Sequence, residues 1–196
     1  MIPTFGRRVA ALILACAALP AAMAADARFG MTDLMAMLAQ VDERTAAFEE
    51  TRRLALLTAP IVRRGTLHYV RPDRLEMRVT APVPETTEII GDRVRVESSD
   101  AVRQWDLAQQ PVALAWIEAI RASLAGDAAT LERHFQASLS GTRAAWNLSL
   151  APRAPEVAAK LSRVDVRGSE SQLTSIEIVE TGGDRISVAI SPQGKN

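Results

Sequence analysis

An alternation of apolar and charged residues is the feature that most constrains the fold of this chain. In residues 74–79, Leu75, Met77 and Val79 alternate with charged side chains. Successive side chains of a β-strand point to opposite faces, so this pattern predicts a strand with one buried and one solvent-facing side. The same alternation returns in residues 144–150. The chain is therefore expected to build a sheet that buries a single face.

Similar segments occur along most of the sequence, separated by residues that end strands or form tight turns. Arg71-Pro72-Asp73, Gly91-Asp92 and Gly182-Gly183 are examples of such turns. Roughly ten strands are expected by this reasoning. They lie at residues 46–61, 63–70, 74–79, 86–90, 93–97, 101–107, 135–139, 144–150, 163–167, 173–181 and 185–190.

Helical spacing of apolar residues predicts three helices. Residues 32–44 form the first, residues 111–126 the second, with a short continuation after Asp127, and residues 152–161 the third. A large antiparallel sheet must curl or split in order to bury its face. The predicted fold class is therefore α+β and mainly β, with one large curved antiparallel sheet and helices against its concave side. Periodicity alone is compatible with either a solid or a hollow interior.

The beginning of the chain is typical of a signal peptide. Arg7 and Arg8 precede an apolar run, and a small-x-small cleavage site ends at Ala24. We expect cleavage after Ala24, export of the protein, and a single domain over residues 25–196. A second interpretation stays open, because residues 13–16 are similar to a lipobox that would make Cys16, the only cysteine, a lipidated membrane anchor.

Composition and motifs argue against nucleic-acid binding and catalysis. Without the signal peptide the basic residues fall from 23 to 21, against 23 acidic residues, so phosphate backbones are not expected partners. His68 and His134 are the only histidines and do not form a metal motif. No nucleophile elbow or phosphate-binding loop occurs in the sequence. Paired carboxylates, which are usually solvated, are present at Glu49, Glu50, Glu85 and Glu88. We expect no enzyme, no metal and no cofactor.

A series of short motifs resembles the LolA family of lipoprotein carriers. A strand that contains Gly65 and Leu67 ends in Arg71-Pro72, and the alternating strand, Pro82 and a strand closing on Gly91-Asp92 follow. Phe48 precedes this series. Leu124-Ala125-Gly126-Asp127 and the strand from Trp146 to Pro152 come after it, in the order of the family. The resemblance spans nearly the whole chain after the signal peptide.

The resemblance implies an unclosed half-barrel whose helices form a lid over an apolar cavity. It implies a non-catalytic periplasmic monomer that carries lipoprotein acyl chains from an exporter in the inner membrane to an acceptor in the outer membrane. Arg71 matches the arginine of the family's Arg-Pro motif, which implies that it latches the lid and controls cargo release. Strand parity places Leu67, Tyr69 and Arg71 on one face. The residues alone leave open that Arg71 only extends its side chain along the barrel rim.

The expected cavity and lid residues are mostly apolar or aromatic. They are Leu67, Tyr69, Arg71, Leu75, Met77, Val79, Ile89, Val94, Val96, Trp105, Trp116, Ile120, Trp146 and Leu148. The chain has Val94-Arg95-Val96 where the family usually has an aromatic pair, and this difference keeps two other functions open. One is a carrier of another lipid or acylated product for a dedicated exporter. The other is a non-catalytic envelope sensor that uses the same half-barrel to detect lipids or proteins.

Overall fold

The computed structural model describes residues 29–192, which contain one antiparallel sheet of eleven strands. The strands are β1 (Glu43–Arg53), β2 (Ile61–Val70), β3 (Arg74–Ala81), β4 (Glu85–Ile90), β5 (Arg93–Ser98), β6 (Val102–Asp106), β7 (Phe135–Thr142), β8 (Ala145–Pro152), β9 (Leu161–Ser169), β10 (Gln172–Glu180) and β11 (Arg185–Pro192). Their order across the sheet is β6-β5-β4-β3-β2-β1-β11-β10-β9-β8-β7. The predicted signal peptide, with Cys16 and the cleavage site at Ala24, lies outside the described residues.

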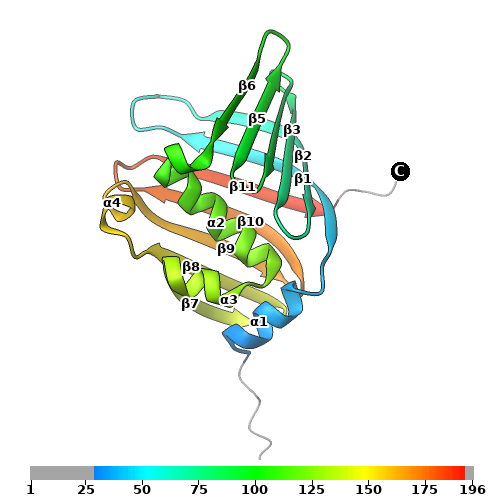
Figure 1. The fold of residues 1–196 in the computed structure, drawn as a ribbon, viewed down its shortest axis with the longest axis vertical. Helices are drawn as coiled ribbons and strands as arrows, with labels where there is room; N and C mark the ends of the chain where they lie inside the picture. Colours follow the sequence, from blue (N-terminus) through cyan, green and yellow to red (C-terminus); the bar gives the residue numbers. More distant parts are fainter. Residues whose placement is uncertain (1–28, 193–196) are drawn as a thin grey trace, which may run out of the picture.

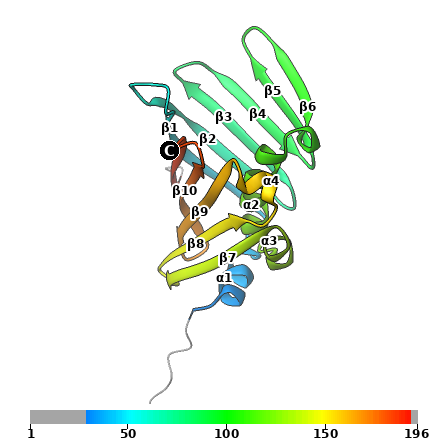
Figure 2. The same ribbon diagram turned by 90° about the vertical axis from the view of Figure 1, so that its left-hand side faces the viewer.

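The sheet curves without closing. The strands β6 and β7 form its two free edges, and the chain between them folds into helices instead of a hairpin turn. Figures 1 and 2 show these helices gathered against the concave face of the sheet. The structure therefore confirms the predicted mainly-β α+β class with an unclosed half-barrel.

The helices are α1 (Met31–Leu38), the 3₁₀ helix η1 (Leu107–Gln109), α2 (Pro111–Ala125), α3 (Ala128–His134) and α4 (Pro155–Ala158). Proline is favourable in the first turn of α2, because the missing N–H has no partner there. Asp127 begins α3 by accepting a hydrogen bond from the Thr130 N–H at 3.0 Å. Within the described chain, no helix combines the length and the apolar character needed to cross a membrane.

The first and last predicted helices are longer than the observed ones. The helix expected at residues 32–44 ends at Leu38, because Glu43 and Arg44 pair with Val70 and Tyr69 in the β1–β2 ladder. The helix expected at residues 152–161 shrinks to α4, because β8 extends to Pro152 and β9 begins at Leu161. In both places the hydrogen bonds of the sheet replace those of the helix.

The solid part of the interior lies under the C-terminal strands. Trp146 and Leu148 are buried there together with side chains from α1, α2 and α3. Gly168 makes room for the indole, because a Cβ at this position would lie 2.1 Å from Trp146 Cζ2. A second, smaller cluster packs β4 and β5 against η1 and α2, and it consists of Ile89, Val94, Val96, Leu107 and Ile117.

Candidate functional site

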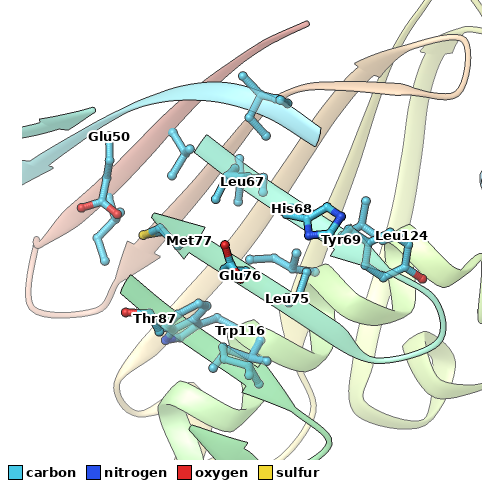
Figure 3. A pocket seen from close by; sticks show the side chains of 18 of the residues that line it. Glu50, Leu67, His68, Tyr69, Leu75, Glu76, Met77, Thr87, Trp116 and Leu124 are labelled. Carbon is cyan, nitrogen blue, oxygen red and sulfur yellow. The ribbon is translucent and has the colours of Figure 1, made fainter. Parts of the chain in front are cut away.

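A cavity of about 640 Å³ lies between the concave face of the sheet and α2 (Figure 3). Strands β1 to β6, β10 and β11 contribute to its wall. The interior is thus hollow along β1 to β6 and parts of β10 and β11, and packed under β7 to β9. The sequence pattern was compatible with either a solid or a hollow interior, and the structure has a part of each kind.

Most of the cavity wall is apolar. The apolar lining consists of Ala46, Leu67, Tyr69, Leu75, Met77, Ile89, Val94, Val96, Trp105, Leu107, Ala113, Trp116, Ile117, Ile120, Leu124, Leu173, Ile176, Ile178, Ile186, Val188, Ile190 and Pro192. A wall of this composition offers few hydrogen-bond partners, so the ligand that it suits has a hydrocarbon surface.

Helix α2 forms the part of the wall that faces the sheet. Trp116, Ile120 and Leu124 recur at intervals of four residues and therefore share one side of the helix. The helix ends at Gly126, whose φ of 67° lies in the left-handed region. A Cβ at Gly126 would lie 2.3 Å from the Met35 carbonyl oxygen. Only glycine therefore lets the end of α2 approach α1 so closely.

Arg71 joins the sheet to the ends of two helices. Its Nη2 donates hydrogen bonds to the Ala39 carbonyl at 2.5 Å and the Ala125 carbonyl at 3.2 Å. Ala39 caps α1 and Ala125 is the last residue of α2. A guanidinium is favourable at this place because helix C-termini carry unpaired carbonyls and partial negative charge. The Nε atom lies 3.4 Å from the Asp42 carboxylate, and the side chain is 30% exposed.

Arg121 makes a second connection between α2 and the sheet. Its side chain is only 8% exposed and lies near the β4–β5 turn. It donates to the Gly91 carbonyl, pairs with Glu118 on its own helix, and lies 3.8 Å from Asp92. Arg71 and Arg121 therefore hold the helix to the β2–β3 turn and to the β4–β5 turn. These two turns lie at the same end of the sheet.

Charged residues occupy the opposite end of the cavity. Glu50 on β1 pairs across the ladder with Arg63 on β2, and their side chains form two hydrogen bonds of 3.0 Å. Arg52 Nε donates to the same carboxylate at 2.5 Å, and Arg63 lies 3.4 Å from Glu85. Figure 3 shows Glu50 across the pocket from Tyr69 and Leu124. The cavity thus has an apolar end under the helices and a charged end near the β1–β2 hairpin loop.

Glu50 is almost fully buried, with an exposed fraction of 1%. Burial alone raises the pKa of a carboxyl group, but hydrogen bonds from Arg63 and Arg52 and the charges of both arginines outweigh this effect. The pKa of Glu50 is therefore below its ordinary value. At the helix end, burial lowers the pKa of Arg44, which donates to the Ser171 carbonyl.

Ten of the fourteen residues expected at the cavity lie on its wall in the structure. They are Leu67, Tyr69, Leu75, Met77, Ile89, Val94, Val96, Trp105, Trp116 and Ile120. Arg71 lies outside the wall, at the helix ends described above. Val79, Trp146 and Leu148 also lie outside it, in the larger packed cluster. Their burial follows the predicted strand parity, but other side chains fill the space in front of them.

The charged end of the cavity is not among the residues predicted from the sequence. Parity could have found it, because Glu50 and Arg52 follow Ala46 and Phe48 on the inward face of β1. Their charge led to the expectation of a solvated pair at Glu49 and Glu50. The isoleucines and valine of β10 and β11 were also missed as lining residues, although they alternate clearly with polar residues.

The site offers binding surfaces more than reactive groups. In the part of the chain that the structure describes, no group of three or more His, Cys, Asp or Glu side chains is placed to hold a metal ion. His68 pairs with Glu43 at 2.8 Å, and Glu76 pairs with Arg74 and Arg78, so these two border residues of the cavity direct their polar ends to other partners. The arrangement is suited to enclosing an apolar ligand.

Comparison with solved structures finds similar folds at low sequence identity. A LolA superfamily protein from Nitrosomonas europaea is 8% identical, with 85% of this chain and 94% of that chain covered and a TM-score of 0.42. MucB of Pseudomonas aeruginosa, solved in complex with MucA, is 14% identical, with 83% and 56% covered and a TM-score of 0.46. An outer membrane lipoprotein-sorting protein domain from Vibrio parahaemolyticus is 8% identical, with 82% and 88% covered and a TM-score of 0.41.

The sequence itself matches one family. No curated protein shows a significant match. The family model described as outer membrane lipoprotein carrier protein LolA-like, however, matches residues 17–192. This match covers nearly the whole chain, including every strand of the half-barrel and the lid helices. The chain therefore belongs to the LolA-like family of outer membrane lipoprotein carrier proteins.

Proposed function

We propose that this protein is a periplasmic carrier that encloses the acyl chains of lipoproteins and takes them from the inner to the outer membrane. The observation that carries this proposal is the apolar cavity of about 640 Å³ beneath α2. Each methylene removed from water contributes about 0.8 kcal/mol, so an acyl chain has a strong tendency to enter such a space. Without a carrier, the free-energy cost of exposing these methylenes to water keeps acyl chains from crossing an aqueous compartment.

A carrier must also release its cargo, and the attachment of α2 suits this requirement. The helix is held to the sheet at one end by the polar contacts of Arg71 and Arg121. These hydrogen bonds can be exchanged for water when the helix moves. The same movement must separate Ile117, Ala119 and Ala122 from the two apolar clusters. Cargo entry and exit then require displacement of the lid and leave the sheet in place.

The proposal includes the partners and the location that this role requires. The protein acts as a monomer without catalysis, metal or cofactor, and meets an exporter in the inner membrane and an acceptor in the outer membrane in turn. Residues 1–24 are a signal peptide, and residues 25–196 are the exported domain. The intact mass of the exported protein should begin at Ala25. A mass that begins at a diacylated Cys16 would contradict this part of the proposal.

The cavity can be blocked without removing a core residue. Thr87 on β4 lines the cavity, whereas its neighbour Thr86 faces the opposite side of the sheet among charged residues. In Thr87→Trp the added indole occupies space that an acyl chain would use. We expect this variant to bind a fluorescent fatty-acid probe about tenfold more weakly, which corresponds to excluding about two methylenes.

Thr86→Trp is the matched control for this experiment. It adds the same side chain to the same strand on the outward face, so it should bind the probe with wild-type affinity. Equal affinities for the Thr87→Trp, Thr86→Trp and wild-type proteins would show that the probe does not enter the cavity and would refute the proposed site.

A further inference from the structure

The cavity combines a hydrocarbon wall with a cluster of arginines at one end. We infer that the charged end is a head-group site, and that the ligand is an amphiphile with an acyl-like tail and an anionic carboxylate or phosphate head. This inference rests on the part of the proposed function that places acyl chains in this cavity, and it narrows the cargo from a lipoprotein to an anionic lipid or acylated product.

The charge near this end favours an anionic head. Arg52, Arg63, Glu50 and Glu85 line it, and Arg103 lies farther along the wall on β6, in the row of paired residues that runs from Thr87 through Val96. These three arginines against two glutamates leave one positive charge. The side chain of Glu50 is only 2% exposed, so it cannot reach a ligand without losing its arginine partners. The groups that remain available to a ligand are therefore mainly cationic.

Two of these arginines have unused hydrogen-bond donors. Arg52 bonds Glu50 through Nε alone, and its Nη1 and Nη2 atoms form no hydrogen bond within residues 29–192. Arg103 on β6 makes neither a hydrogen bond nor an ion pair in that same part of the chain. A guanidinium presents paired N–H groups that match a carboxylate or a phosphate. Both arginines can therefore bind an anion without breaking an existing contact.

The cavity also imposes an orientation on a ligand. Tyr69 and Leu124 lie at one end of the pocket and Glu50 at the other (Figure 3). Arg63 pairs with Glu50 near the β1–β2 loop. A hydrocarbon tail is stable only against the apolar wall, and an anionic head is stable only near arginines with unused donors. Arg44, at the helix end, already donates to Ser171. One orientation of an anionic amphiphile satisfies both conditions, whereas a cationic head would have to compete with Arg63 for Glu50 and Glu85.

The test is displacement of the neutral apolar dye N-phenylnaphthylamine by ligands with the same twelve-carbon tail. Dodecanoate, dodecyl phosphate, methyl dodecanoate and dodecyltrimethylammonium differ only in the head. We expect both anions to displace the dye at about three- to tenfold lower concentration than the neutral ester, as for charge-assisted bonds to partly exposed arginines. The cation should be the weakest competitor. The stronger of the two anions identifies carboxylate or phosphate as the natural head.

Two substitutions assign the preference to this end of the cavity. Arg103→Gln and Arg52→Gln should each reduce the preference for the anions and leave the affinity for the ester unchanged. Arg95→Gln, on the outward face of β5, is the control and should keep the wild-type preference. A purely structural role of these arginines would weaken all four ligands alike and would overturn the inference.

The remaining outcomes separate the inference from the function on which it rests. Equal displacement by all four ligands in the wild-type protein would refute the head-group site and leave the carrier function standing. Failure of the dye and of every ligand to bind would refute both.

Discussion

Glu50 is the residue that most departs from an apolar cavity wall, because a carboxylate is enclosed where the two preceding inward positions of β1, Ala46 and Phe48, are apolar. An unpaired buried charge is strongly unfavourable, and a well-bonded one is tolerated. Arg63 bonds both oxygens of the carboxylate and Arg52 adds a third bond. Glu50 thus fixes the two arginines at the charged end of the cavity.

The lowered pKa of Glu50 has a consequence for stability. A carboxyl group with a lower pKa in the folded state stabilises the protein above its unfolded-state pKa, and this contribution is lost as the pH falls through the folded-state pKa. Glu50→Gln should therefore lower the free energy of unfolding at pH 7 by about 1.5–3 kcal/mol, the range for hydrogen bonds to charged groups. Below about pH 4 the difference from the wild-type protein should shrink.

Urea denaturation at neutral and acidic pH measures this effect. Glu49→Gln is the control, because Glu49 is half exposed and its pair with Arg64 should contribute less than about 1 kcal/mol. A destabilisation by Glu50→Gln that stays constant down to acidic pH would show that the ionised carboxylate is not its source.

At the scale of elements, the decisive contact is between the lid helices and the β2–β3 turn. Three elements meet at Arg71, because the C-terminal carbonyls of α1 and α2 accept hydrogen bonds from one guanidinium that extends from the end of β2. This contact stabilises the position of α2 over the cavity. In the proposed carrier function it would favour a closed lid, and opening would have to replace both hydrogen bonds.

Arg71→Leu should impair transfer more than loading. Loss of both carbonyl bonds makes the empty, closed state less stable relative to the loaded state, so cargo has less tendency to leave. We expect the variant to retain a labelled acylated cargo while passing it poorly to acceptor membranes. Arg95→Leu, on the outward face of β5, should transfer cargo like the wild-type protein. Normal transfer by Arg71→Leu would remove the latch role.

At the scale of the whole molecule, the eleven strands divide the interior into two parts. The strands β7 to β10 bury their inward side chains in the larger packed cluster, whereas those of β1 to β6, together with parts of β10 and β11, surround most of the cavity. Because the sheet does not close, its concave face needs the helices as a cover. A packed part for stability and a hollow part for cargo thus coexist in one sheet.

The sequence predicts the strands well because alternation is a local property. The period of two in β3 and β8 specifies both the strand and its buried face. The boundary of the hollow region depends instead on contacts between distant segments. Trp146 and Leu67 have the same parity pattern, but Trp146 is buried in the larger packed cluster, which includes side chains of α1, α2 and α3, whereas Leu67 lines the cavity. Glu50 was misjudged for a similar reason, because its arginine partner Arg63 lies on another strand.

Native mass spectrometry of the protein purified from its own periplasm, followed by extraction and identification of bound molecules, tests the carrier function most directly. The account predicts adducts that contain acyl chains in the wild-type protein and in Thr86→Trp, and their loss or marked reduction in Thr87→Trp. A wild-type protein that is free of acyl-bearing molecules and takes up no fluorescent fatty acid would contradict it.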